Sequence, residues 1–133
     1  MRLNELLGTE FPFIQGGMAN IATGEFAAAV SNAGALGLIG AGGMTVDTLR
    51  ENIHKCRSLT DRPFGVNIML MNPQAKEMAT LVAEEQIPVI TTGAGNPAPF
   101  LSMWKAAGAK VFPVVAAVAL AKLVARAGAD GVI

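Results

Sequence analysis

The sequence is poor in the side chains that most catalytic sites use: its 133 residues include one histidine, one cysteine and no tyrosine. A single cysteine, Cys56, cannot form an internal disulfide, so we expect a protein of the reducing cytoplasm. Charged residues make up only 15% of the chain, and ten basic residues balance ten acidic ones. This even balance excludes the basic surface that nucleic-acid or anionic-membrane binding requires.

Long apolar runs are also missing. The two longest, residues 33–44 and 111–121, are interrupted by glycine or proline. Both are shorter than the roughly 20 residues that span a bilayer. Mean hydropathy is nevertheless +0.45, and 52% of the residues are hydrophobic. The sequence therefore predicts no membrane association but a domain with much apolar surface to bury.

What is present is an alternation of strand-like and helix-like segments. Six apolar segments have strand length: residues 13–15, 36–39, 64–70, 89–92, 111–115 and 131–133. Five helical segments lie between them: residues 23–32, 46–59, 74–85, 99–107 and 118–127. Their spacing is typical of βα units, and strands that are apolar on both faces are typical of a parallel sheet.

Two parallel architectures fit this pattern. A doubly wound sheet would be complete with five or six strands, whereas a (β/α)8 barrel typically needs roughly 250 residues. However, Gln15-Gly16-Gly17-Met18 does not continue as the G-x-G-x-x-G fingerprint of a doubly wound dinucleotide site. The last strand also stops at Ile133 without a helix after it. By length alone the doubly wound sheet is favoured, whereas an apolar strand that ends at Ile133 favours a larger barrel, so the residues leave both architectures open.

Ligands of parallel α/β folds bind at the carboxyl ends of the strands, so the residues there are the candidate site. They form a rim without carboxylate, histidine or cysteine, made of residues 15–19, 40–43, Asn67 with Met69, 91–96 and 113–116. Such a rim lacks the groups for acid–base, nucleophilic or metal chemistry. Exposed glycine amides and neutral polar groups instead favour binding of a flat or phosphorylated cofactor. Asn67 is the strongest candidate, because an amide within an apolar strand needs a partner.

Four motifs carry a family resemblance. They are the Gly-Gly-Met turn in residues 12–19, the segment 29–39, the Pro-Phe-Gly-Val-Asn strand in 59–70 and the Thr-Thr-Gly-Ala-Gly-Asn-Pro segment in 89–97. In this order and spacing they resemble the flavin-dependent enoyl-acyl-carrier-protein reductases of bacterial fatty-acid synthesis. These reductases belong with the nitronate monooxygenases to one superfamily of FMN-binding TIM barrels. The resemblance extends over the whole chain.

The resemblance implies a fold, a cofactor and a reaction. Residues 1–133 would be the N-terminal portion of a single FMN-binding TIM-barrel domain, an incomplete α/β (β/α)8 barrel with about six parallel strands and five outer helices. Its open edges should make the chain alone aggregate or pair with another chain. FMN would lie at the carboxyl mouth, against the backbone of Gly17, Met18 and Ala19. Asn67 would hydrogen-bond the flavin, and Thr92 and Gly93 would line the floor of the mouth. NADH or NADPH would reduce FMN, which would pass hydride to an enoyl group on acyl carrier protein. A homodimer is expected, and no metal.

One part of the family pattern is absent from these residues. The family's Glu-x-Gly-Gly-His loop, whose histidine is the expected acid, and its phosphate-binding turns follow the sixth strand, beyond Ile133. His54 lies in a helical segment and cannot replace that histidine. We therefore expect the chain alone to be inactive and to bind FMN weakly. Nitronate oxidation and a non-catalytic half-barrel that serves as a binding or assembly module are the alternative functions.

Overall fold

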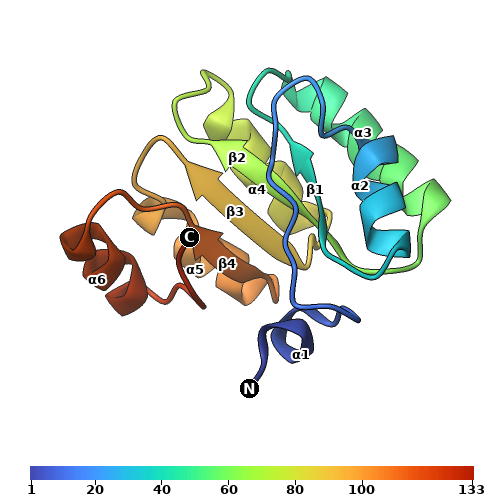
Figure 1. Cartoon of the computed structure of the whole chain (residues 1–133). Coiled ribbons are helices and arrows are strands. Elements are labelled where there is room, and N and C mark those ends of the chain that lie inside the picture. Colours follow the sequence, from blue (N-terminus) through green and yellow to red (C-terminus); the bar gives the residue numbers. More distant parts are fainter.

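Strands and helices alternate along the chain in the computed structural model, which describes residues 1–133 (Figure 1). The strands are β1 (Gly37–Gly40), β2 (Phe64–Met69), β3 (Val89–Gly93) and β4 (Lys110–Pro113). The helices are α1 (Leu3–Leu7), α2 (Gly24–Asn32), α3 (Val46–Leu59), α4 (Ala75–Glu84), α5 (Ala98–Ala106) and α6 (Val118–Arg126). The five helices that the sequence predicts are all present, each within one residue of its predicted bounds.

The four strands form one parallel sheet in the order β1-β2-β3-β4. Each strand pairs with the next along the chain, so Leu38, Gly65 and Val89 lie side by side across the sheet. A doubly wound sheet would reverse its strand order partway. The order found here does not reverse, and the chain is an α/β incomplete barrel, as predicted.

Two of the six expected strands, residues 13–15 and 131–133, do not form regular strands. Residues 13–15 make one isolated parallel bridge, between Ile14 and Leu36 beside β1. Residues 131–133 lie along β4, where the N–H of Ile133 donates to the carbonyl of Pro113 at 3.0 Å. Each segment has a neighbouring strand on one side only, which limits its regular pairing.

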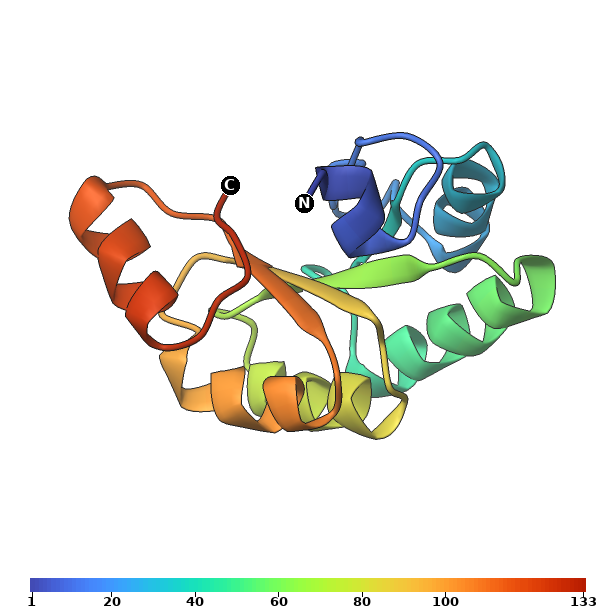
Figure 2. The same ribbon diagram turned by 90° about the horizontal axis from the view of Figure 1, so that it is seen from below.

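Helix α1 is not predicted by the sequence analysis. Five residues are too few to show helical periodicity, and the helix ends at Gly8 in the left-handed conformation, with φ of 72°. Its Leu7 is buried and packs on the inner face of the sheet. Figure 2 shows α1 on the opposite side of the sheet from α4 and α5. The helix therefore covers the inner face of the barrel near the amino ends of the strands.

Two apolar cores lie on the two faces of the sheet. The larger one joins the outer face to the helices and includes Val66, Ile90 and the buried Trp104, whose indole N–H donates to the carbonyl of Ala79 at 3.0 Å. The smaller one lies on the inner face and joins Leu36, Leu38, Val89 and Phe112 to α1. No helix combines the length and the apolarity that crossing a membrane would need.

Candidate functional site

A cavity of about 270 Å³ lies on the inner face of the sheet, toward the carboxyl ends of the strands. Its polar side chains are Gln15, Asn67 and Thr91, and its other lining residues are Leu3, Ile14, Gly16, Gly17, Leu38, Val114 and Ile133. No carboxylate, imidazole or thiol lines it. The cavity thus combines apolar walls with a few neutral hydrogen-bonding groups, a composition typical of small-molecule sites.

Gln15 extends the pairing of the first segment with β1. Its backbone N–H donates to the carbonyl of Leu36 at 3.0 Å. Its side chain continues this pairing to Leu38, where a backbone would otherwise pair. Oε1 accepts the N–H of Leu38 and Nε2 donates to the carbonyl of Leu38, both at 3.1 Å. The side chain is therefore satisfied by the protein, and it holds residues 16–18 over the strand ends.

Two glycines allow this segment to pass close to the sheet. A Cβ atom on Gly17 would lie 2.5 Å from the Cβ of Asn67, and one on Gly40 would lie 2.8 Å from the carbonyl oxygen of Met18. Neither distance is possible for real atoms. A Cβ on the neighbouring Gly16 would meet nothing within 4 Å. Gly17 is thus required by packing, and its backbone lies directly against the side chain of Asn67.

Asn67 and Thr91 lie opposite each other on β2 and β3. The hydroxyl of Thr91 donates to Oδ1 of Asn67 at 2.8 Å. Thr91 is 1% exposed, and this bond is its only side-chain hydrogen bond. The Nδ2 group of Asn67 has no partner within the chain. The cavity therefore contains a half-buried amide donor that is free to bind an acceptor on a ligand.

The residues that the resemblance assigns to the cofactor site lie in different surroundings. Gly17 and Asn67 line the cavity, and Met18 and Ala19 are exposed on the rim beside it. Gly93 ends β3, where a Cβ would meet nothing within 4 Å. Thr92 pairs in register with Ile68 of the outer core, so its buried hydroxyl, which has no partner, faces the helices. A cofactor contact from Thr92 would therefore have to come from its backbone.

Thr91 and Gln15 belong to the rim that the parallel-sheet argument names, but the resemblance assigns them no role. Side chains alternate between the two faces of a strand, so only one of the consecutive threonines can face the cavity. Thr91 is the register partner of Asn67, which lines the cavity, so Thr91 is the threonine that faces the cavity. The signal that could have identified Thr91 in the sequence is its even spacing from Val89, which faces the inner core.

Side chains accept hydrogen bonds from one backbone N–H each at the N-termini of α2, α3 and α5, near the rim. Gly24 of α2 donates to Oδ1 of Asn52 at 2.8 Å, and Val46 of α3 donates to Oε1 of Gln74 at 2.7 Å. Ala98 of α5 donates to Oδ1 of Asn96 at 3.0 Å. Free N–H groups at a helix N-terminus are the usual cradle for phosphate. These three helix N-termini are therefore partly occupied, whereas that of α6 has no side-chain cap.

The single histidine and the single cysteine lie away from the cavity. His54 on α3 is exposed, and its Nε2 lies 3.0 Å from Oε1 of Glu85 at the end of α4. Hydrogen bonding from His54, and to a lesser extent from Arg57, lowers the pKa of Glu85 despite partial burial. Burial raises the pKa of the Cys56 thiol to about 11, which leaves it protonated and unreactive at neutral pH. As expected from the sequence, His54 does not reach the rim.

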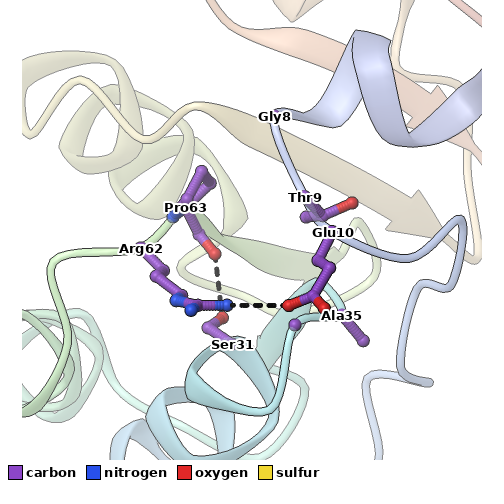
Figure 3. A pocket seen from close by; sticks show the side chains of 8 residues that line it. Gly8, Thr9, Glu10, Ser31, Ala35, Arg62 and Pro63 are labelled. Carbon is purple, nitrogen blue, oxygen red and sulfur yellow. Dashed lines mark hydrogen bonds and ion pairs between the residues drawn. The ribbon is translucent and has the colours of Figure 1, made fainter.

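A smaller hollow of about 120 Å³ lies at the amino ends of β1 and β2 (Figure 3). Arg62 and Glu10 face each other across it at 3.6 Å, and the hydroxyl of Ser31 donates to the carbonyl of Pro63 at 2.8 Å. Both charged side chains are at least half exposed. These contacts join the N-terminal segment and α2 to the start of β2, and they are structural.

Solved structures match this fold over nearly the whole chain. FabK from Thermotoga maritima has 50% sequence identity and a TM-score of 0.95, and the match covers 98% of this chain and 42% of that one. The nitroalkane oxidase from Streptomyces ansochromogenes has 27% identity and a TM-score of 0.86, and the match covers 98% of this chain and 47% of that one.

Curated sequences give a related result. A 5-hydroxy-7a-methyl-1-oxo-octahydro-1H-indene-4-carboxyl-CoA dehydrogenase from Mycobacterium tuberculosis is 37% identical over 131 residues, which are 98% of this chain and 37% of that protein. A probable nitronate monooxygenase from Staphylococcus haemolyticus is 45% identical over 74 residues, which are 56% of this chain and 21% of that protein. The chain thus spans less than half the length of each relative.

A match to a protein-family model assigns the chain to a family. The model described as nitronate monooxygenase matches residues 1–86, which include α1, the Gly-Gly-Met turn and β2 with Asn67. The matched region contains most of the cavity's polar groups, although Thr91 lies outside it. On this match, the chain belongs to the nitronate monooxygenase family.

Proposed function

We propose that residues 1–133 form the N-terminal part of an FMN-binding TIM-barrel domain, and that the whole protein reduces the double bond of enoyl-acyl-carrier-protein with NADH or NADPH in fatty-acid synthesis. The 50% identity to FabK, an enoyl-acyl-carrier-protein reductase, over 98% of the chain supports this reaction. We also propose a homodimer in the cytoplasm. The exposed side chains of Phe13, Val118 and Ile133 supply apolar surface for association.

The free Nδ2 group of Asn67 is the observation that carries the cofactor proposal. It lies in a cavity with apolar walls, and Gly17 keeps the backbone close beside it. The edge of a flavin ring presents carbonyl oxygens and ring nitrogens that accept hydrogen bonds. The residues present therefore fit FMN. When bound, FMN supplies the hydride chemistry of the reaction.

The chain's own residues bind and orient. Asn67 would donate a hydrogen bond to the ring, the backbone of residues 17–19 would hold it, and Leu38 and Ile14 would exclude water from the cavity. None of the lining side chains is a carboxylate, imidazole or thiol that could deliver a proton to the substrate carbon. We therefore place the proton donor outside residues 1–133.

Nitronate oxidation is the second candidate, because the family model and the staphylococcal relative carry that name. Its cofactor site would use the same residues. The two reactions differ in the substrate and in the electron acceptor: an enoyl thioester with NADH or NADPH for the reductase, and a nitronate with oxygen for the monooxygenase.

A fusion protein tests the reaction. Residues 1–133 are joined to the part of Thermotoga maritima FabK that has no counterpart here, which closes the barrel, and NADH or NADPH consumption is followed with crotonyl thioester. We expect turnover that an Asn67→Ala fusion reduces by at least about tenfold, as loss of one buried hydrogen bond predicts. Oxygen-dependent turnover of an alkyl nitronate without enoyl reduction would instead assign the monooxygenase.

The 133-residue chain by itself tests the cofactor. FMN and riboflavin are titrated against it by flavin fluorescence, with Asn67→Ala as the control variant. We expect the two flavins to bind with similar dissociation constants, both weaker than micromolar, because no charged side chain lines the cavity to bind the phosphate. An absence of binding for both flavins would favour the non-catalytic half-barrel.

A further inference from the structure

We propose that Thr91 is a positioning residue: its hydroxyl fixes the side-chain amide of Asn67 so that Nδ2 faces the cavity. The identity of the ligand as a flavin rests on the proposed function above. The orientation of the amide does not, because it follows from contacts within the chain. The two parts can therefore be tested separately.

The first step is the geometry of the pair. Asn67 and Thr91 are register partners on adjacent parallel strands, and both line the cavity. Oγ1 of Thr91 lies 2.8 Å from Oδ1 of Asn67, which is an ordinary length for an O–H···O hydrogen bond. Strands hold both Cα atoms, so the bond joins two positions of a rigid scaffold.

The second step is the direction of the bond. Thr91 is a buried residue, 1% exposed, so its hydroxyl needs an acceptor, and Oδ1 of Asn67 is the only one within the chain that it reaches. If the amide turned by half a rotation, Nδ2 would meet the hydroxyl oxygen and the hydroxyl proton would be left without an acceptor. The lower-energy arrangement therefore directs Nδ2 away from Thr91.

The third step is the wall on the other side of the amide. A Cβ atom added to Gly17 would lie 2.5 Å from Cβ, 2.9 Å from Cγ and 3.1 Å from Nδ2 of Asn67. The backbone of residue 17 thus lies close against the Asn67 side chain, on the side of Nδ2, and leaves no room for a side chain there. The hydrogen bond from Thr91 holds Oδ1, so Nδ2 is left as the free donor of the amide.

This arrangement makes the site selective for acceptors. A preorganised N–H group favours a carbonyl oxygen or an unprotonated ring nitrogen and disfavours an N–H group at the same place. Because the amide is already ordered before binding, less conformational entropy is lost when the ligand arrives. Loss of the Thr91 hydroxyl should therefore weaken binding although Thr91 makes no hydrogen bond to the ligand.

The first experiment examines the ligand-free chain by NMR. The Cγ chemical shift and the Nδ2 order parameter of Asn67 are compared between the unsubstituted chain, Thr91→Val, Thr91→Ser and Thr92→Val. We expect Thr91→Val to shift Cγ and to lower the order parameter, and Thr91→Ser to restore both. Thr92→Val is the matched control, because it removes a hydroxyl from the other face of the same strand. If the Cγ chemical shift and the Nδ2 order parameter of Asn67 are unchanged in Thr91→Val, the proposal is overturned.

The second experiment measures riboflavin and FMN affinity by flavin fluorescence. We expect Thr91→Val to weaken binding by about tenfold, the effect of one buried hydrogen bond, and Thr91→Ser to recover most of it. In an Asn67→Ala background, Thr91→Val should have no further effect, because there is no amide left to position. Equal losses in both backgrounds would contradict positioning. Absence of flavin binding with the expected NMR signature would count against the proposed cofactor and leave the positioning intact.

Discussion

The two ends of the sheet are built from different chemistry. At the carboxyl end, the cavity is lined by apolar and neutral polar side chains, with one amide donor left free. At the amino end, ion pairs join neighbouring elements: Arg57 and His54 with Glu85, Lys105 with Asp130, and Arg62 with Glu10. The difference agrees with the general division of barrel folds into a binding end and a stabilising end. Substitutions at the first end should therefore change binding, and those at the second should change stability.

The largest effect is expected for Gly17→Val. The new side chain would occupy the space of the Asn67 side chain, and overpacking of this kind costs about 1–3 kcal/mol. Flavin affinity should fall by at least about a hundredfold, since the amide donor is displaced as well. Fluorescence titration measures the affinity, and Gly16→Ala, whose new Cβ meets nothing within 4 Å, is the matched control. Equal losses in the two variants would show that Gly17 does not act through Asn67.

At the other end, Asp130→Ala should reduce stability without changing affinity. The carboxylate accepts hydrogen bonds from Nζ of Lys105 at 2.6 Å and from the backbone N–H of the buried Val111 at 2.8 Å. Loss of both hydrogen bonds should lower the free energy of unfolding by about 2 kcal/mol. Urea unfolding followed by circular dichroism measures this loss. Asp130→Asn, which keeps an acceptor for Val111, should lose less, and a similar loss in both would assign the whole effect to charge.

A smaller effect, dependent on pH, is expected at Glu85. The pKa of this carboxyl is lowered in the folded chain, first of all by the hydrogen bond from His54. The lowered pKa adds stability above the unfolded value of about 4.5, and this stability is lost as pH falls through the lower folded value. Glu85→Gln should therefore be less stable at neutral pH, by less than about 1 kcal/mol for such a solvent-accessible pair.

The pH dependence of the urea midpoint separates this effect from a simple loss of packing. The difference between the unsubstituted chain and Glu85→Gln should shrink as the pH is lowered from about 6 to about 3. A difference that is constant over this range would mean that the ionised carboxylate does not contribute. Flavin affinity at neutral pH should be the same in both proteins, since Glu85 does not line the cavity.

The smallest effect is expected for Glu10→Gln. The pair with Arg62 spans 3.6 Å, and both side chains are at least half exposed, so it should contribute less than about 0.5 kcal/mol. Neither the urea midpoint nor the flavin affinity should change measurably. A clear loss of flavin affinity in this variant would contradict the inference that only the carboxyl end of the sheet determines binding.

Much of the fold follows from the sequence, and the exceptions have physical causes. The bounds of α3 are predicted exactly as found, residues 46–59, because a long amphipathic helix shows its period clearly. Helix α1 is missed because five residues show no period, and its stability comes from packing on the inner core. Residues 13–15 and 131–133 are predicted as strands but do not form regular ones, since each has a partner strand on one side only.

The candidate site is divided in the same way. The sequence by itself determined that the strand ends would be neutral and rich in glycine, and that Asn67 would need a partner, because these properties depend on residue type and on the parallel alternation alone. Only the tertiary structure decided that the partner is Thr91 rather than Thr92, that Gln15 completes the pairing with β1, and that Gly17 rather than Gly16 touches the amide. Strand register and the close approach of backbone segments determine these three contacts. Both depend on segments that are far apart in the chain, so the local sequence does not specify them.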